Sequence, residues 1–313
     1  MAEAVSPAWM QRTFEQVKNW GRWGKDDQRG ALNYITPERR AAAAALVREG
    51  EVVGCGLDLP VEPAADNPNP ALHMMVAAGD ACTTELMPGL EMSLDWFGVA
   101  CHGGAVSHID ALCHVFVDGK MYNGFAASDV KSTGAQRNAI TSAAPDGIAG
   151  RGVLLDIPRV RGVRWLELGD QVTPDDLLAA ERAQGTPVRE ADILLIATGR
   201  HERRDAHGPW VVTEEGMAGL HPACISLLHE RRIAVLGSDG FSDAIGAPSI
   251  PGWPVPVHQC CLVAMGVHLL DNLDFRALSR ACAERKRWEF FFVVQPLRIA
   301  NATGSPVNPT AIF

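Results

Sequence analysis

Residues 107–114 read Ser-His-Ile-Asp-Ala-Leu-Cys-His, and the rest of the chain is interpreted outward from this stretch. It brings His108, Asp110 and His114 close together in the sequence. In an extended strand, residues two apart project from the same face about 6 to 7 Å apart, so His108 and Asp110 can bind one metal ion from the same side. His114 has the same parity and can either close over that ion or act on its water. Imidazole and carboxylate ligands together suit Zn²⁺ or Mn²⁺.

A second interpretation stands beside this one. With 10 His in 313 residues, a chance pair at this spacing is common, and a histidine in an apolar segment often serves only packing. Three possible ligands within one apolar run favour the metal, because burying them unpaired would cost about several kcal/mol. An ion with few protein ligands keeps a position open for water and makes that water a nucleophile at neutral pH. From spacing alone, both interpretations stay open.

Composition sets the class of protein. A chain of 313 residues with 47% hydrophobic residues can bury a large core, and no linker divides it, so we expect one domain over 1–313. It has no apolar run long enough for a membrane helix and no signal-peptide pattern, which predicts a cytoplasmic protein with no membrane partner. The net charge of −9 and the lack of a Lys/Arg stripe argue against nucleic acid. A small-molecule substrate is the expected partner.

The eight cysteines form no Cys-x-x-Cys pair and mostly occupy apolar segments. We therefore expect small buried side chains and no disulfide framework. Cys113 adjoins His114, and a Cys-His nucleophilic pair is the alternative. Adjacent residues point to opposite faces of a strand, which disfavours that pair.

Strands and helices alternate after about residue 150, which predicts an α/β or mixed α+β fold. Residues 1–30 form a Trp-rich N-terminal arm that packs on the body or on a neighbouring subunit. The predicted helices are 36–48, 174–184, 222–230, 258–270 and 275–285. The predicted strands are 52–59, 153–157, 193–198, 233–236 and 290–296, with a polar loop over 200–215.

Further ligands must come from the second half of the chain. His258 and Asp271 are candidates, although a continuous helix over the 13 residues between them would separate the two by roughly 20 Å. Each can instead cap a helix. His221 precedes a helix, where it can meet a substrate as a neutral imidazole or simply cap that helix. Asp239 follows a buried strand and can support the site or form an Asx turn.

An aromatic wall for a flat substrate can come from Trp96 and Phe97, although aromatic residues usually belong to the core. Other motif classes are missing from the sequence. It contains no G-x-x-x-x-G-K-[ST] loop, no G-x-G-x-x-G between a strand and a helix, and no G-x-S-x-G elbow. A nucleotide cofactor and a serine-triad mechanism are therefore not expected.

The chain resembles the cyclase family of metal-dependent hydrolases, which includes bacterial kynurenine formamidases, isatin hydrolases and proteins named as polyketide cyclases. The family motif, a His and Gly followed by Thr-His-x-Asp-x-Pro-x-His, corresponds to residues 102–114 here, with Ser107 in place of the Thr and Leu112 in place of the Pro. The resemblance extends over most of the chain and looks closest to a longer branch of the family. That branch is marked by Trp23-Gly24, 26–28, 30–33, 118–124, 237–239 and 304–309.

The resemblance implies a role for each matching residue. His108 and Asp110 would bind the metal, with Asp110 able to bridge two ions, and His102 would match the first family His. His114 would be the general acid/base. His258 would bind a second ion, and Asp271 would stand where the kynurenine formamidases use a Glu.

As a whole, the resemblance implies a swivelling β/β/α-type core, a homodimer or homotetramer, and one or two Mn²⁺ or Zn²⁺ ions per chain. The implied activity is hydrolysis of a small cyclic or aryl amide, lactone or formamide by metal-activated water. A metal-dependent cyclase or dehydratase and a non-catalytic ligand-binding protein are the alternatives.

Overall fold

The computed structural model describes residues 5–80, 89–246 and 249–313. Its centre is a nine-stranded sheet in the order β1-β15-β13-β7-β9-β11-β12-β4-β14. These strands are β1 (Val52–Gly54), β4 (His108–Asp110), β7 (Ile148–Asp156), β9 (Ile193–Ala197), β11 (Val235–Ser238), β12 (His268–Asp271), β13 (Glu289–Val294), β14 (Gly304–Pro306) and β15 (Thr310–Ile312). Three small two-stranded sheets pair β2 (Leu72–Ala77) with β3 (Leu94–Gly98), β5 (Val130–Lys131) with β6 (Gly134–Ala135), and β8 (Gln171–Val172) with β10 (Gly219–Leu220).

The middle of the large sheet is parallel: β7, β9, β11 and β12 run in one direction. Strand β9 reads Ile-Leu-Leu-Ile-Ala and is buried throughout. Such continuous apolar strands are expected where both faces of a parallel sheet are covered. Strand β4 joins this core antiparallel to β12 on one side and to β14 on the other.

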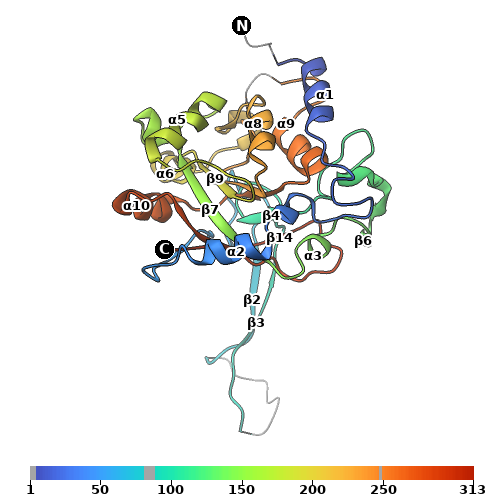
Figure 1. Cartoon of the computed structure of the whole chain (residues 1–313). Coiled ribbons are helices and arrows are strands. Elements are labelled where there is room, and N and C mark those ends of the chain that lie inside the picture. The colour runs from blue at the N-terminus through green and yellow to red at the C-terminus, as the bar shows by residue number, and fades with distance from the viewer. Residues whose placement is uncertain (1–4, 81–88, 247–248) are drawn as a thin grey trace.

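The longer helices surround the sheet (Figure 1). They are α1 (Pro7–Gln16), α2 (Pro37–Ala44), α5 (Pro174–Gln184), α6 (Arg200–His207), α8 (Cys224–Arg231) and α10 (Arg276–Arg285). The short ones are α3 (Ile140–Ala143), α4 (Ile157–Arg161), α7 (Val212–Glu215), α9 (Pro256–His258), the 3₁₀ turns η1 (Gly30–Tyr34), η2 (Tyr122–Gly124) and η3 (Ala127–Asp129), and the π-helix η4 (Gln259–Met265). Together with the sheet they make the predicted mixed α/β single domain.

Helix α5 has the predicted bounds because both of its ends are encoded locally. Thr173 and Asp176 form a reciprocal capping box, and Gly185 ends the helix at φ +62°. Helix α2 also starts as predicted, with the Thr36 side chain accepting a hydrogen bond from Arg39 N, but it ends at Ala44 instead of Arg48. Strand β1 is likewise shorter than the predicted 52–59.

The predicted polar loop over 200–215 is wrong, because α6 and α7 lie there. The first turn of α6 has an unusual cap. The Asp239 carboxylate, distant in sequence, accepts hydrogen bonds from the backbone N–H groups of Thr198, Gly199 and Arg200. A carboxylate at a helix N-terminus accepts hydrogen bonds from the free N–H groups of the first turn and interacts favourably with the helix dipole. The sequence around α6 could not predict this cap, because the capping residue is about 40 positions away.

The predicted helix over 258–270 is only half correct. Helical structure stops at Met265, the chain turns at Gly266 with φ +68°, and residues 268–271 are strand β12. The turn requires glycine, since a Cβ on Gly266 would lie 2.5 Å from Tyr122 Cε2. This turn folds Asp271 back toward His258.

Two segments differ in how they meet the body. The N-terminal segment packs on its own chain: Met10 is fully buried, and Trp20 Nε1 donates to the Val263 carbonyl at 2.7 Å. The β2–β3 hairpin instead projects away from the body (Figure 1). None of the helices within the described ranges is long and apolar enough to cross a membrane.

Candidate metal centre

Strands β4 and β12 bring three predicted ligands to one face of the sheet. His108 and Asp271 are direct cross-strand partners, and Asp110 lies two residues beyond His108 on β4. Residues two apart on a strand share a face. Ile109 between them is fully buried. Each of the three polar side chains is also buried, so the sheet presents imidazole and carboxylate groups inside the protein.

Asp110 lies at the centre of this cluster. Its Oδ1 is 2.9 Å from His102 Nδ1 and 3.5 Å from His108 Nε2. On the other side, Asp110 Oδ2 is 3.7 Å from His258 Nε2. His258 Nε2 is in turn 3.2 Å from Asp271 Oδ2. The predicted separation of His258 and Asp271 therefore does not arise, because the chain turns at Gly266.

The cluster contains two overlapping sets of possible metal ligands. One is His102, His108 and Asp110, and the other is Asp110, His258 and Asp271. Within each set the ligand atoms lie within 4.8 Å of one another. Asp110 belongs to both sets, and a carboxylate with two oxygens can face two ions.

Two imidazoles are held through Nδ1, so that Nε2 of each ring faces the cluster. His108 Nδ1 donates to the Val106 carbonyl at 2.8 Å, and His258 Nδ1 donates to Asp243 Oδ2 at 2.6 Å. Nε2 of His108 then faces Asp110, and Nε2 of His258 lies between Asp110 and Asp271, where it can bind a cation once it has released its proton. A metal-binding histidine characteristically donates its other ring N–H to a carboxylate or a carbonyl in this way.

The orphaned polar atoms of the cluster also fit a cation. Asp110 Oδ1 and Oδ2 and His102 Nδ1 are among the buried polar atoms of the described residues that make no hydrogen bond, although His102 Nδ1 and Asp110 Oδ1 lie 2.9 Å apart as an ion pair. Leaving both oxygens of a buried carboxylate unpaired is costly. Ligation of a divalent cation would satisfy both oxygens and the free imidazole nitrogens.

Electrostatics agree with this fit. Burial opposes ionisation of Asp110, but four surrounding imidazoles hold the pKa of its carboxyl well below the usual range. Burial also opposes protonation of His258, yet Asp243 and Asp271 raise its pKa well above the ordinary value. The buried carboxylates are therefore stabilised by positive charge. Protonated histidines supply that charge when no cation is bound, and a divalent cation would supply it in their place.

His114 lies at the edge of the cluster. Its Nε2 is 4.0 Å from Asp110 Oδ1, and its side chain is 31% exposed. The ring stacks on His102 with centroids 3.8 Å apart and planes 2° apart. Burial lowers the pKa of His114 to about 4, against the opposing effect of the Asp110 carboxylate. A neutral imidazole open to solvent beside a ligand cluster can accept and return a proton.

The loop before β4 is fixed by residues that the sequence did not reveal. Asn272, at φ +56°, donates through Nδ2 to the carbonyls of Gly103 and Val106. Buried Arg200 bonds to Asn272 Oδ1 and to the Gly104 carbonyl. Ser107 Oγ donates to the Asn272 carbonyl at 2.6 Å. These contacts hold the segment that carries His102 and His108.

Asp243 and Ser242 are two further residues that sequence analysis missed. The Asp243 carboxylate accepts hydrogen bonds from His258 Nδ1 and from the backbone N–H groups of Val257 and His258. Ser242 Oγ lies 3.2 Å from Asp271 Oδ1. In the sequence, Asp239 and Asp243 both follow β11, and nothing in the pattern distinguishes the one that contacts His258.

The structure does not bring the other predicted site residues to the cluster. His221 Nδ1 accepts a hydrogen bond from Ala223 N just before α8. Trp96 and Phe97 are on the projecting hairpin, 46% and 57% exposed. Cys113 is a free thiol whose pKa burial raises to about 12, so it is not a thiolate nucleophile at neutral pH. Cys82 lies outside the described residues.

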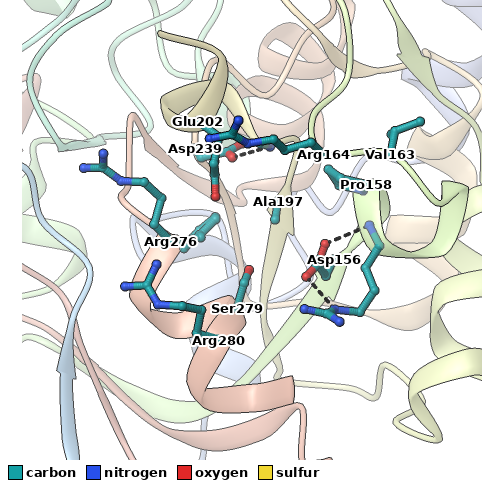
Figure 2. A pocket seen from close by; sticks show the side chains of 13 residues that line it. Asp156, Pro158, Val163, Arg164, Ala197, Glu202, Asp239, Arg276, Ser279 and Arg280 are labelled. Atoms are coloured by element: carbon teal, nitrogen blue, oxygen red, sulfur yellow. Dashed lines mark hydrogen bonds and ion pairs between the residues drawn. The ribbon is translucent and has the colours of Figure 1, made fainter. Parts of the chain in front are cut away.

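Asp239 lines a different cavity of about 410 Å³ with residues of α4 and α10 (Figure 2). The cavity is polar, with Glu202 and Arg276 beside Asp239 in the figure. None of the six clustered histidines and aspartates is among its lining residues. Asp239 therefore serves the start of α6, and the metal-ligand cluster lies elsewhere.

The protein is thus a mixed α/β protein with a buried His/Asp cluster, which suits a metal ion, at strands β4 and β12. Residues 71–243 match the family described as "Putative cyclase", and the chain belongs to that family. A crystal structure described as a novel cyclase is 30% identical, covers 95% of this chain and 99% of its own, and superposes with a TM-score of 0.85.

Two further solved structures share the fold at lower identity. Isatin hydrolase A from Labrenzia aggregata, bound to benzyl benzoate, is 20% identical over 86% of this chain and 94% of its own, with a TM-score of 0.57. A predicted metal-dependent hydrolase from Bacillus stearothermophilus is 15% identical over 83% of this chain and 97% of its own, with a TM-score of 0.52. No curated protein matches the chain.

Proposed function

We propose that this protein is a metal-dependent hydrolase of a small cyclic or aryl amide, lactone or formamide. The observation that carries the proposal is the buried Asp110 carboxylate, whose two oxygens lack hydrogen bonds while facing His102 and His108 on one side and His258 on the other. A structural aspartate would be hydrogen-bonded at this depth, as Asp239 is.

The ligands would come from His102, His108 and Asp110 in one set and from Asp110, His258 and Asp271 in the other. Imidazole with carboxylate suits Mn²⁺ or Zn²⁺, and the shared Asp110 allows one ion or two. Such a cation supplies Lewis acidity, both toward the carbonyl oxygen of a substrate and toward water.

His114 has the position of the general acid/base. It adjoins the ligand cluster without making a hydrogen bond to it, and its exposed edge faces solvent. Burial lowers its pKa to about 4, so the ring is neutral at physiological pH and can take a proton from the attacking water. The same nitrogen then returns the proton to the departing nitrogen or oxygen.

The substrate class rests on family membership and on the neighbours with the same fold, three of which are isatin hydrolases by name. Isatin is a cyclic aryl amide, so a lactam of this size is the first compound to test. His114 is consistent with both amide and lactone substrates, because the departing nitrogen and the departing oxygen each need a proton.

The test combines elemental analysis with a substrate panel. Purified protein should contain Mn or Zn at one or two ions per chain, and it should hydrolyse members of a panel of isatins, formanilides and lactones. Removing the metal with a chelator should abolish turnover, and adding it back should restore turnover. Activity that persists in metal-free protein would refute the proposal.

Cyclisation or dehydration is the competing activity, and the family description favours testing it. Turnover in ¹⁸O-water separates the two, because hydrolysis alone incorporates the label into the product. A ligand-binding protein without catalysis would bind panel members, yet it would convert none of them.

A further inference from the structure

His102 differs from the other candidate ligands because it lies outside the regular structure. The others lie on strands β4 and β12 or at the end of helix α9. His102 lies in the loop before β4, where no strand pairing fixes its position. A metal-binding imidazole is normally oriented by a hydrogen bond to the ring nitrogen that does not bind the metal. For His102 this contact has to come from another part of the chain.

Strand β14 brings that contact to the loop. It lies beside β4 on the side away from β12 (Figure 1), and Gly304 is the cross-strand partner of Asp110. Thr303 comes immediately before this strand, and its carbonyl accepts the backbone N–H of Ala111 at 2.9 Å. The backbone of Thr303 is therefore fixed against the strand that carries the candidate ligands.

The Thr303 hydroxyl contacts one nitrogen of the His102 ring. Thr303 Oγ1 lies 3.0 Å from Nε2, whereas Nδ1 of the same ring lies 2.9 Å from Asp110 Oδ1. Among the described residues, this Nδ1 is one of the buried nitrogens that make no hydrogen bond. His108 and His258 have the reverse arrangement, because each is held through Nδ1 and faces the cluster with Nε2.

Two further contacts restrict where the His102 ring can lie. On one face, the His114 ring stacks on it with centroids 3.8 Å apart. A Cβ on Gly304 would lie 2.7 Å from His102 Cε1 and 3.1 Å from Nε2, so the ring can approach β14 this closely only because residue 304 is a glycine. The ring is thus confined by a stacked imidazole, a bare stretch of backbone and a hydroxyl.

A hydroxyl is a suitable partner for a metal-binding ring. With a cation on Nδ1, the one ring proton of His102 is on Nε2, and Thr303 Oγ1 is within reach to accept it. A hydroxyl oxygen has lone pairs to accept this hydrogen bond whether Nδ1 carries a proton or a cation. The contact can therefore be formed before the metal binds and kept afterwards.

We propose that Thr303 is a positioning residue of the metal centre, which holds His102 so that it binds the cation through Nδ1 while His108 and His258 bind through Nε2. This inference rests on the metal-dependent function proposed above. It gives a role in the site to β14, which supplies none of the candidate ligands.

Competition with a chromogenic chelator measures the contribution of the hydroxyl. Thr303→Val keeps the shape of the side chain but removes the hydroxyl, so metal should bind about 10- to 100-fold more weakly. Thr303→Ser restores the hydroxyl and should bind metal like the wild type. The matched control is Thr310→Val, since Thr310 is also half-buried but lies on β15, and it should leave the affinity unchanged. Circular dichroism should be the same for all variants.

Proton NMR of the Co²⁺-loaded protein shows which nitrogen of each ring binds. Ring protons next to the bound nitrogen give broad shifted lines, and those further away give sharp ones. A ring bound through Nε2 has a single distant proton, on Nδ1, which exchanges in D₂O. A ring bound through Nδ1 has two distant protons, one on Nε2 and one on Cδ2. The wild type should therefore show a sharp shifted line that persists in D₂O, and His102→Ala should lack it.

Three results would overturn this inference while leaving the proposed function in place. They are a Thr303→Val variant that binds metal as tightly as the wild type, a Thr303→Ser variant that binds as weakly as Thr303→Val, and a Co²⁺ spectrum without a sharp shifted line that persists in D₂O. A wild type that binds no divalent cation would instead refute the proposed function, and this inference with it.

Discussion

The Asp243 carboxylate lies 2.6 Å from Nδ1 of His258 and also accepts the backbone N–H of the same residue at 3.0 Å. These two contacts fix both the ring orientation and the tautomer of His258. Its Nε2 is then directed between Asp110 and Asp271. Asp243 thus orients a candidate metal ligand without belonging to either candidate ligand set.

The Asp243→Asn variant should bind metal about 10- to 100-fold more weakly, the usual effect of losing a carboxylate behind a metal-bound histidine. An amide oxygen can still accept from Nδ1–H but stabilises the imidazole less. Competition with a chromogenic chelator measures the affinity. The exposed Asp146→Asn is the control and should match the wild type. An unchanged affinity in Asp243→Asn would show that His258 needs no such support.

Asp192 predicts a pH dependence of folding stability. Burial raises the pKa of its carboxyl to about 6, and Arg151 at 2.6 Å offsets this only in part. The folded state therefore holds a proton that the unfolded state, with a pKa of about 4, has already lost. The contribution of Asp192 to the free energy of unfolding should fall as pH rises from about 4 to about 6 and stay level above.

Urea unfolding of the wild type and Asp192→Asn across this range measures that contribution as a difference. The wild type should lose stability relative to Asp192→Asn with rising pH, and Asp146→Asn should show no such trend. If the wild type instead became more stable relative to Asp192→Asn as pH rises, the ion pair with Arg151 would outweigh the effect of burial on the Asp192 carboxyl.

Several elements could be predicted because their signals are local. Thr173, Pro174 and Gly185 define both ends of α5, and the two-residue spacing of His108 and Asp110 gave a shared face on a strand. The same rule could not locate β12, because His268–Asp271 continues an apolar run that begins in a helix. Gly266, in a left-handed turn where a Cβ would clash with Tyr122, separates the two, and that contact is remote in sequence.

The site shows the same division. His108, Asp110, His258 and Asp271 were proposed from residue type, and the structure brings them together. Asp243 could not be found that way, since its significance comes from the ring that it faces across the fold. Trp96 and Phe97 looked like a substrate wall or core, but neither pattern could reveal that their strands leave the body.

Replacing Asp110 should affect both ligand sets together. In Asp110→Asn, the metal content should fall to background, because Asp110 is the one residue that belongs to both ligand sets. A metal that binds only the folded state would stabilise the wild type by about 3 kcal/mol at a free concentration 100-fold above the dissociation constant. A chelator should thus lower the thermal unfolding midpoint of the wild type but leave that of Asp110→Asn unchanged. The exposed Asp58→Asn should respond like the wild type. Full metal content in Asp110→Asn would exclude the carboxylate as the common ligand.

His114→Ala distinguishes proton transfer from metal binding at the same cluster. The His114 ring stacks on His102 and stays 4.0 Å from Asp110, outside both ligand sets, so its loss should leave the metal content unchanged. Turnover of isatin or another hydrolysed panel member should fall by about 10²- to 10⁴-fold, the usual contribution of a general acid/base. His207→Ala, an exposed histidine elsewhere, should keep full turnover. A loss of metal from His114→Ala would make this residue a ligand, and an unchanged turnover would mean that water alone carries the proton.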